Sequence, residues 1–317
     1  MEIRKEMLSV QRPVGGYEEI NSIKESIMNG WWTKGPKVEE FERKFAEYVG
    51  AKYAVGVTSN SHGQDLVMKA LGIKDADVIS PTMSFISTAI VPIWNNCTSN
   101  IVDIRDHDLN IDPKDVKQNL KKNTEAIIAV NMAGIPAPID EIREFYDGLI
   151  IEDCAHSCYA PGAGTKGDVA VWSFQAVKTL PTGDGGMITT NDYELYKKLQ
   201  SLSWFGIEST YSRVSGNTHI KKGESKSVKN PEGKPGYTWD YDVNDVGYKY
   251  YMIDLIASIG LVQLDKLSKH LEIRRYIQKR YNEELKGLIE IPEWSETVQY
   301  YCARVPKDHR DLLIEYL

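Results

Sequence analysis

Two short segments of the chain carry side chains that could do chemistry together. Residues 152–156 read Glu-Asp-Cys-Ala-His and directly follow an apolar run at 148–151. A second apolar run, 169–172, is followed by a serine and, five residues later, a lysine within 173–178. A lysine for a Schiff base, a carboxylate for a ring nitrogen and a hydroxyl for a phosphate are the groups that pyridoxal phosphate (PLP) requires. We therefore interpret the two segments as a PLP site.

Each of these side chains has a role in that interpretation. Lys178 is the candidate Schiff-base lysine, which also moves a proton between substrate and cofactor. Asp153 is the candidate partner of the pyridine nitrogen, because an ionised carboxylate there keeps the nitrogen protonated. Ser173 is a candidate phosphate ligand. The alternative for Lys178 is an ordinary solvated surface lysine, and the alternative for Asp153 is an aspartate that caps a helix.

Composition narrows the class of protein. The chain has 317 residues, of which 42% are hydrophobic and 26% are charged, the balance of a soluble globular protein with a sizeable core. The formal net charge is −7, whereas a protein that binds nucleic-acid backbone needs a basic face. We therefore expect no nucleic-acid partner.

The cysteines and the N-terminal residues bear on metals and location. Cys97, Cys154, Cys158 and Cys302 match no zinc-ligand spacing, so we expect no metal and read them as reduced thiols. Residues 1–11 are charged and lack the apolar core of a signal peptide, and no stretch is long and apolar enough to span a membrane. These features predict a cytoplasmic protein that does not associate with membranes.

Strands alternate with helices through the first two thirds of the chain, which predicts an α/β domain with a mostly parallel sheet covered by helices on both faces. Ligands of such sheets bind at the carboxyl ends of the strands, where Asn60, Asp153 and Ser173 are expected to lie. The expected strands are 53–57, 78–80, 101–104, 126–130, 149–151, 169–174 and 187–189, and the expected helices include 38–49, 59–71 and 87–94.

The remaining segments are less regular. Residues 207–246 are rich in Gly, Ser, Lys and Asn and are too long for an ordinary connection, so they form either a functional loop or a solvated one. We predict two helices, at 251–267 and 272–285, and then a strand at 298–305 before a last helix at 308–317.

Six motifs in order make the chain resemble the DegT/DnrJ/StrS family of sugar aminotransferases, PLP enzymes of the aspartate-aminotransferase fold (fold type I). They are GWWTKGP at 30–36, ADVI at 76–79, IEDCAH at 151–156, SFQAVK at 173–178, GYKYYM at 247–252 and IGLVQL at 259–264. The resemblance implies a large PLP-binding domain over residues 1–250. It also implies linking helices and a small α/β domain, apparently incomplete, over residues 251–317.

The resemblance assigns further residues to the cofactor. It implies that Phe85 stacks on the pyridine ring, although an ordinary core phenylalanine is an alternative. His156 corresponds to a family residue close to that ring; a structural histidine is the alternative. Lys249 stands where many relatives have an Asn that reaches the phosphate of the neighbouring subunit, which implies a homodimer with shared active sites. A lysine on a solvated turn is the alternative.

Other assignments concern the phosphate and the substrate. Asn60 and Ser61 are candidate phosphate ligands, with Ser61 standing where the family has Thr. Thr33 and Lys34 lie in the loop that borders the substrate in relatives. Gln175 stands where His or Asn is common, and we include it among the cofactor contacts with its role open.

The implied function is amino transfer from glutamate to a keto group, at ring position three or four, of a nucleotide-linked deoxysugar, as in amino-sugar and polysaccharide biosynthesis. Family members that dehydrate their substrate carry His in place of this lysine, so Lys178 favours amino transfer. The alternatives are a non-catalytic PLP-binding or regulatory protein, and an aminotransferase for a cyclitol or another keto acceptor.

Overall fold

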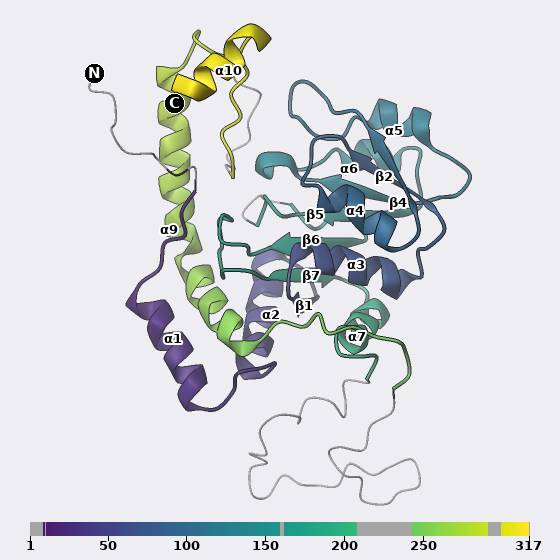
Figure 1. The fold of residues 1–317 in the computed structure, drawn as a ribbon, viewed down its shortest axis with the longest axis vertical. Coiled ribbons are helices and arrows are strands. Elements are labelled where there is room, and N and C mark those ends of the chain that lie inside the picture. Colours follow the sequence, from purple (N-terminus) through teal and green to yellow (C-terminus); the bar gives the residue numbers. More distant parts are fainter. Residues whose placement is uncertain (1–8, 10, 159–161, 208–242, 291–298, 317) are drawn as a thin grey trace, which may run out of the picture.

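A single mixed sheet organises the chain in the computed structural model, which describes residues 9, 11–158, 162–207, 243–290 and 299–316 (Figure 1). In these residues seven strands are ordered β1-β7-β6-β5-β4-β2-β3. The strands are β1 (Tyr53–Val57), β2 (Asp77–Pro81), β3 (Thr98–Val102), β4 (Thr124–Val130), β5 (Leu149–Asp153), β6 (Val169–Ser173) and β7 (Gly186–Thr190).

Neighbouring strands from β3 to β6 are parallel, whereas β7 runs antiparallel to both β6 and β1. The mostly parallel α/β sheet predicted from the sequence is confirmed, and it belongs to fold type I. The expected strand at 101–104 is wrong by a few residues, since β3 lies earlier in the chain. The parallel strands place their carboxyl ends at one edge, where β5 ends at Asp153 and β6 at Ser173.

The helices of the described residues are α1 (Tyr17–Met28), α2 (Pro36–Val49), α3 (Asn60–Leu71), α4 (Ser87–Trp94), α5 (Pro113–Asn119), α6 (Ile139–Arg143), α7 (Tyr193–Leu202), α9 (Asp254–Glu284) and α10 (Lys307–Tyr316), with a 3₁₀ turn at Met132–Gly134. Helices α2, α3, α4, α5 and α7 pack on strands of the sheet, whereas α1 packs on α9 (Figure 1). Strand β6 shows why both faces are covered. Its Ala170 and Trp172 join the core beside α2 and α9, while Val169 and Val171 join the core beside α3 and α7. Alternate residues of a strand face opposite sides.

The C-terminal segments differ from the prediction in two places. Instead of two helices, α9 is one 31-residue helix, because the polar residues 268–270 include no Gly or Pro and Leu271 is buried in the core. The strand expected at 298–305 is also wrong for the described residues 299–305, where Arg304 makes only an isolated bridge with Glu290.

Most of the predicted insertion at 207–246 lies outside the described residues. Its described ends meet, since Ile207 and Val243 pair in an antiparallel bridge. No helix in the described ranges is long and apolar enough to cross a membrane.

Candidate active site

Asp153 sits at the end of β5 with only 4% of its surface exposed. Its Oδ1 accepts hydrogen bonds from the Ala155 amide and from Asn60 Nδ2, both at 3.0 Å. Its Oδ2 accepts one from Gln64 Nε2 at 2.9 Å. A carboxylate can accept about four hydrogen bonds. Among the described residues, Oδ2 therefore keeps room for one more donor.

The charge on Asp153 is set by opposing effects. Burial raises the pKa of this carboxyl group, while the Ala155 amide, the charge of Lys178 and the amides of Asn60 and Gln64 lower it. The donors around Asp153 stabilise its ionised form, because each of them binds the negative charge.

Gln64 is a site residue that the sequence analysis missed. Its side chain is fully buried on α3, one helical turn after Asn60, and Nε2 also donates to Asn60 Oδ1 at 2.8 Å. Both partners of Nε2 are acceptors, so the orientation of the amide group is fixed. The available signal was a polar side chain on the helix face that also buries Leu66 and Val67.

The side chain of Asn60 is engaged differently from the prediction. Besides Asp153, its Nδ2 donates to the carbonyl oxygen of Val171 at 3.0 Å. The Asn60 side chain therefore binds the carboxylate of Asp153. Its backbone amide, in the first turn of α3, can still bind a phosphate.

Lys178 follows β6 in a turn closed by a hydrogen bond from its own amide to the Gln175 carbonyl oxygen at 2.8 Å. Burial lowers the pKa of Lys178, and the charge of Asp153 opposes that shift. A lower pKa favours the neutral amine, which is the nucleophilic form. The two residues that the sequence assigned to the cofactor are thus close enough for each to influence the charge of the other.

His156 is held as a neutral ring. Burial, together with the charge of Lys178, lowers its pKa to about 3. The backbone amide of Ala133 donates to His156 Nδ1 at 3.3 Å, and the ring packs edge-on against Tyr300 with centroids 4.9 Å apart. Because Nδ1 accepts, the proton of the neutral imidazole resides on Nε2, which is then a hydrogen-bond donor.

Gly186 brings the predicted phosphate ligands together. It pairs with Ser173 across the strands, and a Cβ at this position would lie 2.6 Å from the Ser59 carbonyl carbon and 2.7 Å from the Asn60 nitrogen. The end of β6 therefore lies against the start of α3, where Ser61 is half-buried. The end of β6, which carries Ser173, and the first amides of α3 are therefore neighbours, and the start of a helix is suited to binding an anion.

Three of the predicted cofactor residues, Phe85, Gln175 and Lys249, are exposed. Phe85 shows 72% of its surface, which excludes the core alternative and leaves its ring free for stacking. Lys249 is exposed as well, on the segment that leads into α9. Gln175 Oε1 accepts from the Val177 amide at 2.9 Å and so stabilises the turn that carries Lys178.

The predicted substrate loop is fixed to the rest of the chain. The Thr33 hydroxyl lies 2.9 Å from the Tyr251 hydroxyl, and Lys34 Nζ lies 3.5 Å from Glu42 Oε1. The carboxylate of Asp254 accepts hydrogen bonds from the Lys37 and Val38 amides and so caps α2 just after this loop. The charge of Lys34 is therefore already paired within the chain.

These residues fit PLP. Asp153 has an acceptor position left for a pyridinium N–H, and Lys178 is a half-buried amine close enough for the charge of Asp153 to influence it. Ser173 and the start of α3 offer donors for the phosphate, and Phe85 offers an exposed aromatic face. By contrast, no group of three His, Cys, Asp or Glu side chains suited to a metal ion occurs in the described part of the chain.

Known proteins with similar sequences point the same way. SpsC of Bacillus subtilis, a spore coat polysaccharide biosynthesis protein, is 36% identical over 297 residues, covering 90% of this chain and 72% of SpsC. An uncharacterised protein of Methanocaldococcus jannaschii is 36% identical over 294 residues, with the same coverage of 90% and 72%.

Similar solved structures include a putative sugar aminotransferase from Streptococcus pneumoniae in its PMP form, with a TM-score of 0.84 and 27% identity over 98% of this chain and 82% of that one. The aminotransferase TlmJ from Streptoalloteichus hindustanus has a TM-score of 0.83 and 28% identity over 98% and 81% of the two chains. The model of the DegT/DnrJ/EryC1/StrS aminotransferase family matches residues 13–317. The chain belongs to this family and is a PLP-dependent sugar aminotransferase.

Proposed function

We propose that this aminotransferase moves an amino group from glutamate to a keto group, at ring position three or four, of a nucleotide-linked deoxysugar. The observation that carries the proposal is the group formed by buried Asp153 and the half-buried Lys178 and His156, just after the carboxyl ends of β5 and β6. The relationship to SpsC, named for polysaccharide biosynthesis, favours a sugar that is destined for a polysaccharide.

PLP, when bound, supplies an electron sink for the carbon that gains or loses the amine. Asp153, whose Oδ2 has room for a further donor, would hold the ring nitrogen and keep it protonated. The amine of Lys178, with its lowered pKa, takes a proton from the substrate carbon and later returns one. His156, with its proton on Nε2, donates a hydrogen bond within the site and does not change charge near neutral pH.

We further propose a cytoplasmic homodimer in which Lys249 contributes to the phosphate site of the partner subunit. Lys249 is exposed, so its ammonium group is available to another chain. Four free cysteines agree with a reducing compartment.

Absorption spectroscopy of the PLP-loaded protein tests the donor. Glutamate should convert the visible band of the lysine-bound cofactor to the band of the amine form, and Lys178→Ala should lack this conversion. A panel of keto sugars with and without a nucleotide diphosphate then tests the acceptor by mass spectrometry. If glutamate converts the cofactor but only a cyclitol accepts the amine, the acceptor proposal is wrong. If no amino acid changes the spectrum, a non-catalytic binding role replaces the proposal.

A further inference from the structure

The side chain of Gln299 lies across the turn that carries Lys178. Gln299 Nε2 donates to the Val177 carbonyl oxygen at 2.9 Å, and Oε1 accepts a hydrogen bond from the Thr179 hydroxyl. Gln299 and Thr179 are both buried, with 3% of the surface of each exposed. The residues on both sides of the lysine are therefore held by one amide group.

The backbone of Gln299 reaches the second catalytic side chain. Its N–H donates to the Ala133 carbonyl oxygen at 3.0 Å, and the Ala133 N–H donates to His156 Nδ1 at 3.3 Å. The next residue, Tyr300, packs edge-on against the same imidazole ring. A displacement of Gln299 would thus move both the backbone and the ring that orient His156.

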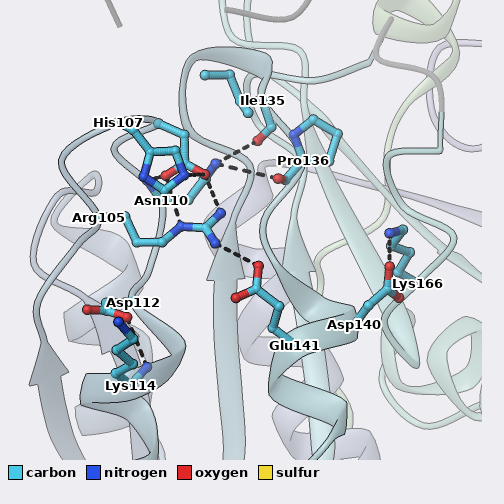
Figure 2. Close-up of polar contacts among 11 residues, drawn as sticks. Arg105, His107, Asn110, Asp112, Lys114, Ile135, Pro136, Asp140, Glu141 and Lys166 are labelled. Atoms are coloured by element: carbon cyan, nitrogen blue, oxygen red, sulfur yellow. Dashed lines mark hydrogen bonds and ion pairs between the residues drawn. The ribbon is translucent and has the colours of Figure 1, made fainter. Parts of the chain in front are cut away.

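The loop around Ala133 is itself anchored. Ala133 has a φ of 53°, a left-handed conformation that a residue with a side chain adopts only where its surroundings impose it. Buried Asn110 supplies that constraint: its Oδ1 accepts from the Met132 amide at 3.0 Å, and its Nδ2 donates to the carbonyl oxygens of Ile135 and Pro136 (Figure 2). The carbonyl group of Ala133 is therefore a fixed point on which Gln299 docks.

Two further contacts hold Gln299 in place from outside. Gln11 exchanges two hydrogen bonds with it, at 2.6 and 2.7 Å, and Arg274 of α9 donates to its carbonyl oxygen at 3.4 Å. Arg304, five residues later, pairs with Asp106 at 3.2 Å. Contacts at Gln299 and at Arg304 thus hold both ends of the segment 299–304. Through its hydrogen bonds, Gln299 in turn holds the turn that carries Lys178.

We propose that Gln299 is a positioning residue that sets the orientation of Lys178 and His156. The amide group suits this position, because it donates to the Val177 carbonyl and accepts from the Thr179 hydroxyl at once. The inference rests on the proposed roles of Lys178 and His156, but it does not depend on which amino donor or sugar the enzyme uses.

The test uses Gln299→Met, which keeps the length of the side chain and removes its three side-chain hydrogen bonds, to Val177, Thr179 and Gln11. The readout is the pH titration of the visible band of the PLP-loaded protein without any substrate, which reports the environment of Lys178. We expect the midpoint to shift by about 0.5 pH unit or more, since the loss of one hydrogen bond has that order of effect. We also expect kcat for the preferred amino donor to fall roughly tenfold, with a smaller change in KM.

The matched control is Gln263→Met. Gln263 is also a buried glutamine, with 2% of its surface exposed, and its Nε2 donates two hydrogen bonds of 2.8 Å, to the Val14 carbonyl oxygen and Glu19. It should lower thermal stability comparably and leave the titration midpoint unchanged. An equal shift in both variants would mean that Gln299 acts only through general stability, and the proposal would be wrong.

A second variant covers the case in which Gln299→Met does not fold. Thr179→Val removes the same hydrogen bond from the side of the turn and should shift the midpoint in the same direction. The double variant should shift it less than the sum of the two single changes, because they break one interaction. Additive shifts would contradict the proposal. A wild-type protein without a titrating band would instead overturn the assignment of Lys178, so the two failures are distinguishable.

Discussion

Gln64 Nε2 lies 2.9 Å from Asp153 Oδ2, a contact that joins the first turns of α3 to the end of β5. The oxygen that Gln64 binds is the one with room for a further donor. Gln64 stabilises the ionised form of Asp153, and in the proposed site it would fix the direction in which the carboxylate faces the pyridine nitrogen.

Replacing Gln64 by Met should weaken PLP binding. A lost hydrogen bond to a charged group costs about 1.5–3 kcal/mol, so we expect the dissociation constant to rise by roughly ten- to a hundredfold. Quenching of tryptophan fluorescence by PLP measures it. Gln200→Met is the control, since Gln200 is a buried glutamine on α7 whose Nε2 donates to the Tyr196 hydroxyl. Equal losses of PLP affinity in the two variants would remove Gln64 from the site.

Phe85→Ala should separate binding from stability. The ring is 72% exposed, so its removal should change the free energy of unfolding of the cofactor-free protein by no more than about 0.5 kcal/mol. Loss of stacking should weaken PLP binding by roughly two- to tenfold, from about 0.5–1.5 kcal/mol. Chemical denaturation and a PLP titration give the two values. Phe174→Ala, at a fully buried ring, should show a stability loss of about 3–5 kcal/mol. A Phe85 variant with unaltered PLP affinity would refute the stacking role.

His156→Asn should change how stability depends on pH. The pKa of His156 is about 3 in the folded chain and near 6.5 when unfolded. Between these values the unfolded chain binds the proton and the folded chain does not, so this histidine makes stability fall as pH decreases through that window. The slope is at most about 1.4 kcal/mol per pH unit. Asn keeps an acceptor for the Ala133 amide without titrating.

Denaturation midpoints of wild type and His156→Asn between pH 4 and pH 8 give the measurement. The difference in stability between the two proteins should be constant above about pH 7 and should grow in favour of the variant as pH decreases below 6.5. A difference that does not vary with pH would show that the folded and unfolded chains share one histidine pKa.

Mixing two inactive variants tests the shared active site. In a dimer whose site combines Lys178 of one chain with Lys249 of the other, Lys178→Ala and Lys249→Ala subunits form hybrids with one intact site. Random reassociation makes half of the dimers hybrid, so about a quarter of wild-type activity should return. Refolding an equal mixture and assaying amino transfer measures this recovery. An absence of recovery, with hybrids demonstrated by mass spectrometry, would place Lys249 in the site of its own chain.

The sequence predicted the parts of the site that depend on short stretches of chain. Asp153 and Lys178 each follow an apolar strand, and strand order brings their ends together, so local patterns were sufficient. Gln64 was missed because its role depends on a contact 89 residues away, and Gln299 because it lies 122 residues from its partner Val177. Neither separation leaves a periodic signal.

The predicted break between helices 251–267 and 272–285 was wrong for a related reason. Residues 268–270 are polar, which is typical of a helix end, yet the buried Leu271 continues the apolar face of α9. The second half of α9 has fewer buried residues and carries ion pairs such as Lys279–Glu283 and Arg280–Glu284. Such i,i+4 pairs contribute only about 0.3–0.5 kcal/mol each. The length of α9 therefore depends on its continuous apolar face more than on its surface ion pairs.

Because α9 is unbroken, a small tilt at one end of the helix displaces the residues at its other end. At one end Asp254 holds the start of α2 and its amide binds the Thr33 carbonyl, and twenty residues along Arg274 holds Gln299. Those residues span about 30 Å of helix, so a tilt of about 2° carries the far end through about 1 Å. A displacement of that size in an active site can cost about a hundredfold in rate. Substitutions that kink α9 should therefore alter turnover although they touch no catalytic group.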